Sequence, residues 1–101
     1  MKHQHLTELD DADVLPYRSL RNAERLLHDG VFVAEGEKVV RALLATDYPI
    51  VSMLMSTGRF EQLADELSTR LDDDTVVYTA PDELVDGIVG FTMHKRLMAL
   101  A

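Results

Sequence analysis

The stretch VFVAEGEKVVRALLA, residues 31–45, decides the fold of this chain. Its first four residues are a continuous apolar run, which is typical of a short strand buried on both faces. The Glu-Gly pair at 35–36 interrupts the run, and apolar residues then recur at the spacing of one helix face. The stretch therefore predicts a buried strand, a tight turn and a helix.

The rest of the chain repeats this alternation. Apolar strand-like runs at 50–55, 75–79 and 97–101 are separated by segments with helical periodicity. Strands that alternate with helices of this length are connected as βαβ units, which favours parallel pairing. Together with the run in the opening stretch, the pattern predicts an α/β domain with a small, largely parallel or mixed four-stranded sheet.

The strongest helical pattern follows Ser56, whose hydroxyl suits a helix N-cap. From Phe60 onward, apolar residues repeat at i, i+3, i+4, i+7 and i+11. Glu66 and Arg70 are four residues apart on the polar side, which favours an ion pair between them. A second helix start is indicated at Thr79, where a hydroxyl and a proline precede two acids.

Composition limits the possible functions. The chain has 101 residues, a net charge of −8 and no cysteine, so we expect a single cytoplasmic domain without disulfides. The polar, acidic residues 1–13 are expected to form a flexible segment, with the domain at 14–101. No apolar run is long enough to span a membrane, and the acidic balance argues against wholesale attraction to nucleic acid.

No complete catalytic, cofactor or metal motif is present. A phosphate-binding loop or dinucleotide fingerprint needs several spaced glycines, whereas Gly36 stands alone between two carboxylates. His3 and His5 lack a third ligand at metal-binding spacing. We therefore predict no catalytic residue, no metal and no cofactor in this chain.

Two groups of basic residues stand out against the acidic background. Arg18, Arg21 and Arg25 are spaced to share one face of a helix, and His94-Lys95-Arg96 precedes the last strand. A row of guanidinium groups on a rigid element can bind phosphates. The alternative for both groups is an ordinary solvated surface.

Three blocks of sequence resemble one protein family. Residues 32–44, FVAEGEKVVRALL, resemble the F-x-x-E-G-x-x-x-V-x-x-L segment of the SpoU (TrmH-type) RNA ribose 2′-O-methyltransferases. Residues 17–21, YRSLR, match the family's Y-R-x-L-[KR], and residues 88–95, IVGFTMHK, resemble its I-x-G-F-x-x-H-[RK]. The family's next residue is a glycine, which Arg96 replaces here. The blocks agree with the family in order and spacing across roughly residues 8–101.

The resemblance implies an L30e-like three-layer α/β/α sandwich that serves as the N-terminal substrate-binding domain. In the family this domain helps to hold ribosomal or transfer RNA, and a SAM-binding SPOUT domain with a trefoil knot follows it. That catalytic domain is absent from this chain. The chain alone is then not an enzyme and binds RNA weakly. Its full-length parent is a homodimeric SAM-dependent methyltransferase.

The resemblance also assigns site residues. Expected RNA contacts are Arg18, Arg21, Arg25, Lys38, Arg41, His94, Lys95 and Arg96. Expected turn or capping residues are Glu35, Gly36 and Gly90. Glu35 has two candidate roles, accepting hydrogen bonds from a base edge or capping nearby backbone amides, and we favour capping.

A second hypothesis assigns no RNA to the chain. In that view the domain is a protein-interaction or dimerisation module of the same fold. Its acidic surface would discourage RNA, and the apolar last strand at 97–101 would pair with another chain.

Overall fold

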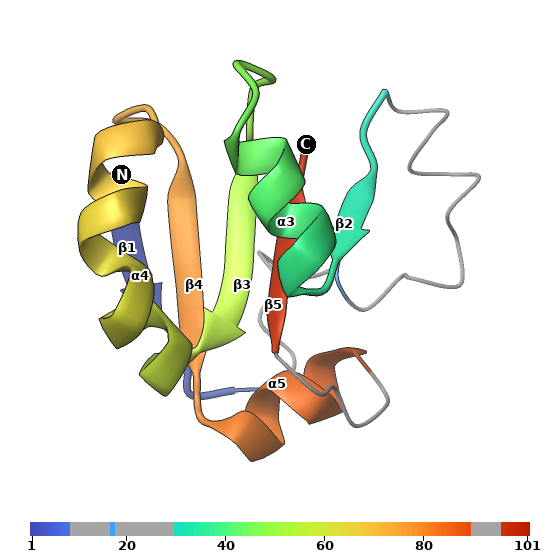
Figure 1. Ribbon diagram of the computed structural model, residues 1–101. Helices are drawn as coiled ribbons and strands as arrows, with labels where there is room; N and C mark the ends of the chain where they lie inside the picture. The colour runs from blue at the N-terminus through green and yellow to red at the C-terminus, as the bar shows by residue number, and fades with distance from the viewer. Residues whose placement is uncertain (9–16, 18–29, 90–95) are drawn as a thin grey trace.

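A computed structural model describes residues 1–8, 17, 30–89 and 96–101 (Figure 1). The strands and helices are β1 (Lys2–His5), β2 (Val33–Glu35), α3 (Glu37–Leu44), β3 (Ser52–Ser56), α4 (Thr57–Arg70), β4 (Val76–Ala80), α5 (Asp82–Val89) and β5 (Leu97–Leu100). The predicted α/β class is confirmed. None of the helices in these ranges is long and apolar enough to cross a membrane.

The sheet is mixed and has five strands in the order β1-β4-β3-β5-β2. Strands β1, β4 and β3 are parallel to one another, as the βαβ pattern predicted for β3-α4-β4. Strand β5 runs antiparallel to both of its neighbours, β3 and β2. The sheet therefore has a parallel half and an antiparallel half, joined at the β3–β5 pair.

The position of β5 overturns one expectation. Both edges of this strand are paired, since Leu100 lies opposite Ser52 of β3 on one side and Val33 of β2 on the other. The last strand is therefore an interior strand and offers no open edge to another chain.

The first strand is a further difference from the sequence analysis, which assigned residues 1–13 to a flexible segment. Lys2–His5 instead form β1 at the edge of the sheet beside β4. The side chains explain the pairing: His3 Nε2 lies 2.8 Å from Thr79 Oγ1, and the His3 ring stacks on Phe60 at 4.2 Å between centroids. The sheet thus gains a fifth strand, and the Thr79 hydroxyl contacts histidine instead of capping α5.

A hydrophobic core lies on each face of the sheet, because successive strand residues point to opposite sides. Helices α3 and α4 cover one face (Figure 1), where Val40, Leu63 and Leu67 pack with the strand residues Met53, Met55, Val77, Leu97 and Ala99. On the other face α5 contributes Val85, Ile88 and Val89, which pack with Leu6, Tyr17, Leu54, Tyr78, Met98 and Leu100. The described elements therefore form the expected helix–sheet–helix layers.

Tyr17 belongs to the second core and forms a buried side-chain pair with a strand serine. Its hydroxyl lies 2.6 Å from Ser52 Oγ, and the ring is fully buried. Burial raises the pKa of the Tyr17 phenol, an effect that the hydrogen bond to Ser52 partly offsets. The YRSLR block at residues 17–21 is therefore linked to β3 through its first residue, Tyr17.

The ends of α4 show one prediction confirmed and one wrong. Ser56 is the N-cap, and its hydroxyl accepts a hydrogen bond from the Arg59 amide at 3.4 Å. The predicted Glu66–Arg70 pair is not formed, because Glu66 pairs with Arg41 of the neighbouring helix. Arg70 donates instead to backbone carbonyls at and after the end of α3, those of Leu44, Thr46 and Tyr48.

Candidate functional site

Three chain segments converge where β2 turns into α3. The Gly36 amide donates to the Leu97 carbonyl at 3.0 Å, and the Gly36 carbonyl accepts from the Val40 amide at 3.0 Å. Beside it, the Ser56 amide donates to the Arg96 carbonyl at 3.2 Å. We call this place the Gly36 corner: the Gly36 turn, with Glu35 before it, Lys38 in the first turn of α3, and Leu97 of β5 hydrogen-bonded to it.

Gly36 makes the sharp turn that the corner requires. It is the N-cap of α3 and has φ 93° and ψ 157°, a conformation open to glycine and strained for residues with a Cβ. Among the described residues, apart from Gly36 and its two chain neighbours, no heavy atom lies within 4 Å of the place a Cβ would occupy. The glycine is therefore needed for its backbone angles and not for space.

Glu35 differs from the capping role favoured by the sequence analysis. Gly36 is itself the N-cap, and the exposed Glu35 carboxylate makes no hydrogen bond or ion pair with any described residue. Of the two candidate roles of Glu35, capping of backbone amides and acceptance of hydrogen bonds from a base edge, this geometry is compatible with the second.

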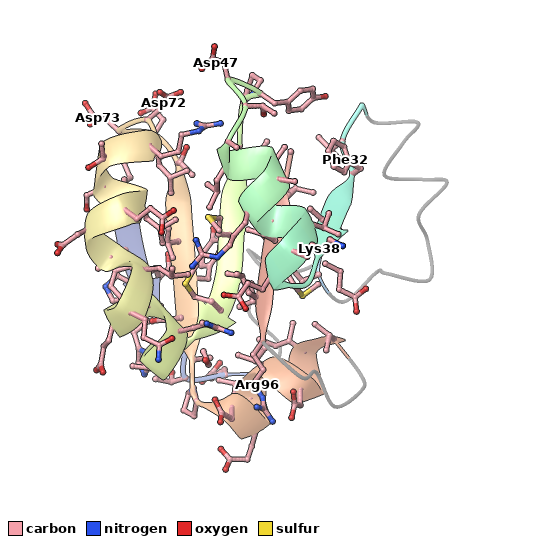
Figure 2. All side chains as sticks on the ribbon, viewed as in Figure 1. Phe32, Lys38, Asp47, Asp72, Asp73 and Arg96 are labelled. Carbon is pink, nitrogen blue, oxygen red and sulfur yellow. The ribbon has the colours of Figure 1, made fainter. Side chains whose placement is uncertain are left out.

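Lys38 is the exposed cation of the corner (Figure 2). The carboxylate next to it in the sequence, that of Glu37, is engaged elsewhere: it lies 3.3 Å from Arg41 Nε and 3.4 Å from Arg59 Nη2. Because those guanidinium groups compensate Glu37, its negative charge opposes an anion near Lys38 less than the sequence suggests.

Arg41 faces α4 and not the corner. It pairs with Glu37 one turn earlier and with Glu66 of α4, both at 3.3 Å, and its side chain is 46% exposed. The hydrogen bond from Arg41 to Glu37 is the main cause of a raised Arg41 pKa, followed by the Glu66 charge. Exposed ion pairs of this kind are weak in water. The Arg41 charge is therefore already compensated by these two carboxylates.

Arg96 is engaged by two acids of α5. Its Nε and Nη2 lie 3.1 and 2.9 Å from the two carboxylate oxygens of Asp86, and its Nη1 lies 3.5 Å from Asp82. The hydrogen bond with Asp86 is the largest cause of a raised Arg96 pKa. The residue also has φ 46°, in the left-handed region where a Cβ is disfavoured. This is the position at which the resembled family has glycine.

The other predicted site residues, Arg18, Arg21, Arg25, Gly90, His94 and Lys95, lie outside the described residues. Among the described ones, Glu35 and Lys38 flank the Gly36 turn, the Arg96 side chain points to α5, and Arg41 lies three residues after Lys38 in α3, paired with Glu37 and Glu66. The sequence analysis missed Asp86 and Asp82 as partners of Arg96. No local pattern could have found them, since Arg96 and the two acids lie on different elements and their contact depends on how α5 packs beside the start of β5.

A concave surface lies away from the Gly36 corner, at the carboxyl ends of β1 and β4. It is open, mostly apolar, and lined by His5, Leu6, Thr7, Pro81, Glu83, Leu84 and Gly87. No lysine or arginine is among these lining residues, so the surface offers no obvious phosphate contact. Within the described ranges, no group of three His, Asp or Glu side chains is placed to hold a metal ion.

Comparison with known proteins gives a structural likeness only. No family model matches the sequence, and no curated protein matches it. The fold resembles an AdoMet-bound rRNA methyltransferase from Sinorhizobium meliloti, with TM-score 0.71 and 19% identity over 97% of this chain and 36% of that one. A second structure, of an rRNA methyltransferase from the same organism, gives TM-score 0.72 and 19% identity over 99% and 37%.

The chain therefore spans little more than a third of the length of these methyltransferases. At 19% identity the likeness shows a shared fold. It locates the match in one part of the larger proteins and assigns no residue a role.

Proposed function

We propose that this chain is the RNA substrate-recognition domain of a SAM-dependent ribose 2′-O-methyltransferase of the SpoU (TrmH) type. The observation that carries the proposal is that 97% of the chain superposes on only 36% of an rRNA methyltransferase. The three sequence blocks, which resemble the same class of enzyme, support it independently.

The Gly36 corner is the surface proposed to meet RNA. The FVAEGEKVVRALL block at residues 32–44 forms β2 and α3. Its glycine, Gly36, makes the turn that brings Glu35 and Lys38 to one edge of the sheet. An exposed ammonium group can neutralise a phosphate, and an unpaired carboxylate can accept hydrogen bonds from a base edge. The proposed interface also includes Arg18, Arg21 and Arg25, and His94 and Lys95 before β5.

Methyl transfer is proposed to belong to another part of a longer parent protein. SAM would supply the methyl group there, and no residue of this chain is assigned to hold it. The parent is proposed to act as a homodimer on ribosomal or transfer RNA. With a net charge of −8, this chain should bind RNA weakly and with a strong dependence on salt.

The test is a fluorescence anisotropy titration of the chain with labelled fragments covering 16S and 23S ribosomal RNA, and with bulk tRNA. We expect binding to at least one of them that weakens as salt rises. The R18A/R21A and K38A variants should each weaken it, and the salt slope should fall by about 0.7–0.9 for each phosphate that is no longer neutralised.

Lys2→Ala is the matched control for Lys38→Ala. It removes the same charge from an exposed lysine on the edge strand β1, away from α3. Unchanged affinity in both corner and arginine variants would reject the proposed interface. Absence of binding by the wild-type chain to every RNA tested would reject the function itself.

The dimerisation hypothesis is not retained in its original form. It rested on the acidic surface and on pairing through the last strand, and the second ground is lost because both edges of β5 are occupied.

A further inference from the structure

We infer that Arg96 is a positioning residue for the Gly36 corner and does not itself contact RNA. Through its ion pairs with Asp86 and Asp82 it fixes the start of β5, against which the Gly36 turn is hydrogen-bonded. The inference rests on the proposed function, because it concerns how the corner is held ready for RNA.

The Arg96 guanidinium group is already bound to carboxylates. Three of its nitrogens face carboxylate oxygens of α5, two of them in a bidentate pair with Asp86. A bidentate arginine–carboxylate pair fixes both distance and orientation. To reach a phosphate, Arg96 would have to give up this geometry, whereas Lys38 is already exposed on the same corner.

The Arg96–Asp86 pair is also shielded from water compared with the Arg41–Glu66 pair, and about as shielded as the Arg59–Glu37 pair, whose side chains are 16% and 29% exposed. The Arg96 and Asp86 side chains are 24% and 20% exposed, against 46% and 52% for Arg41 and Glu66. Ion pairs with less contact to water are screened less by salt. The Arg96–Asp86 pair is therefore suited to hold the start of β5 in place at the salt concentrations where RNA is bound.

Backbone hydrogen bonds connect the start of β5 to the neighbouring segments. The Arg96 carbonyl accepts from the Ser56 amide, and the next carbonyl, that of Leu97, accepts from the Gly36 amide. Gly36 lies between Glu35 and the helix that carries Lys38. Fixing Arg96 therefore acts on the Gly36 turn through one backbone hydrogen bond, from the Gly36 amide to the Leu97 carbonyl, while the other bond ties the start of β5 to Ser56.

The left-handed backbone of Arg96 supports the same interpretation. A glycine at position 96 would adopt φ 46° without strain. The arginine that stands there directs its side chain to the acids of α5. A strained residue persists where its surroundings hold it there. Here the α5 carboxylates are the groups that hold it.

The Asp86→Asn variant separates the two roles, because they predict opposite signs. If Arg96 contacts RNA, removing the Asp86 charge releases the guanidinium group and removes a repulsive charge, so RNA binds more tightly. If Arg96 positions the corner, the start of β5 loosens, and we expect at least a five-fold weaker affinity in the same anisotropy titration with ribosomal RNA fragments.

Asp73→Asn is the matched control. It makes the same charge change in the turn after α4, which Figure 2 shows at the opposite end of the molecule from Arg96. We expect its affinity to stay within two-fold of wild type. Before RNA is added, the amide NMR signals of Gly36 and Leu97 should shift in D86N and not in D73N.

A charge swap provides a second, independent readout. The R96D/D86R variant keeps the net charge and re-forms the pair in reverse, and aspartate tolerates the left-handed region better than most residues. We expect R96D alone to lose RNA affinity and the swap to recover most of it. If D86N unfolds at the assay temperature, the RNA affinity of R96D/D86R compared with that of R96D still tests whether Arg96 acts through its ion pair.

The outcomes are distinguishable. If the wild-type chain binds none of the RNAs, the proposed function fails and the inference falls with it. If wild type binds RNA, affinity in D86N equal to or tighter than in D73N overturns the inference and leaves the proposed function standing. A swap that is folded yet as weak as R96D overturns it as well.

Discussion

Two surfaces of this domain use their basic residues differently. Between α3 and α4, Arg41 and Arg59 link Glu37 and Glu66 across the two helices, with the Arg41 and Glu66 side chains about half exposed. At the Gly36 corner Lys38 is exposed, and next to it Arg96, which is less exposed than Arg41, is bound to acids of α5.

The difference shows that the role of a basic residue depends on the acids that folding brings to it. Arg41 and Lys38 are three residues apart in one helix, and both were expected to contact RNA. Only Arg41 has a carboxylate one turn away and another on the adjacent helix. The corner and the α3–α4 surface should therefore respond differently to substitution.

The largest expected effect is the loss of stability on truncating Leu97, the β5 residue to which the Gly36 turn is hydrogen-bonded. Leu97 is fully buried and lies next to Arg96, so Leu97→Ala leaves a cavity and should lower the free energy of unfolding by about 2–4 kcal/mol. Chemical denaturation measures this. Val39→Ala, on an α3 residue that is 52% exposed, is the control and should change it by less than about 0.5 kcal/mol. Equal effects would contradict the assignment of the core.

The next effect concerns the turn. Gly36→Ala places a Cβ at φ 93° with no atom nearby, so its cost is conformational and should be about 1–2 kcal/mol. Gly58→Ala is a matched control in the first turn of α4, where space is also open and φ is not positive. It should stabilise the domain by about 0.5 kcal/mol. A thermal melt in which both variants gain stability would reject the glycine argument.

A buried polar pair contrasts with these surface interactions. Tyr17→Phe leaves Ser52 Oγ without its 2.6 Å partner inside the core, which should cost about 1–2 kcal/mol. The Y17F/S52A double variant should cost less than the sum of the single changes, because neither group is then left unpaired. Strict additivity in urea denaturation would mean that the two hydroxyls do not depend on each other.

The same tyrosine gives the domain a stability that depends on pH. Burial raises the pKa of Tyr17 above its ordinary value of 10.0, so the folded protein keeps a proton that the unfolded chain loses. The stability of wild type should therefore fall as pH rises above about 10, by up to about 1.4 kcal/mol per pH unit, and be unaffected by this group below it. Y17F should lack this component of the alkaline loss.

The smallest expected effect is on the α3–α4 surface. Glu66→Gln breaks the exposed pair with Arg41 and should hardly move the melting temperature, because water and salt screen such pairs. Any loss of stability should vanish at about 1 M salt. A loss as large as that of Gly36→Ala would show that this surface is as important to stability as the corner.

The sequence predicted the parts of the fold that local pattern controls. The stripe from Phe60 and the hydroxyl of Ser56 located α4, and the alternation of strand and helix predicted the parallel β3–β4 pair. It did not predict β1, because Lys2–His5 is polar and unpatterned and gains its place from contacts with Thr79 and Phe60.

Long-range pairing was the other thing that the sequence could not supply. The insertion of β5 between β3 and β2, the Glu66–Arg41 pair and the Arg96–Asp86 pair all join residues whose spacing carries no periodic signal. For the site, the turn at Gly36 was recognisable from a strand run meeting a helix run, whereas the capping role expected of Glu35 was not what the backbone required.

The proposed RNA-recognition role is tested most directly by mapping where RNA touches the chain. Titration of the ¹⁵N-labelled protein with ribosomal RNA fragments should shift the amide signals of Glu35, Gly36 and Lys38 most, with smaller shifts on the exposed face of α4. Shifts confined to α4, or no shifts at RNA concentrations well above those of the protein, would contradict that role.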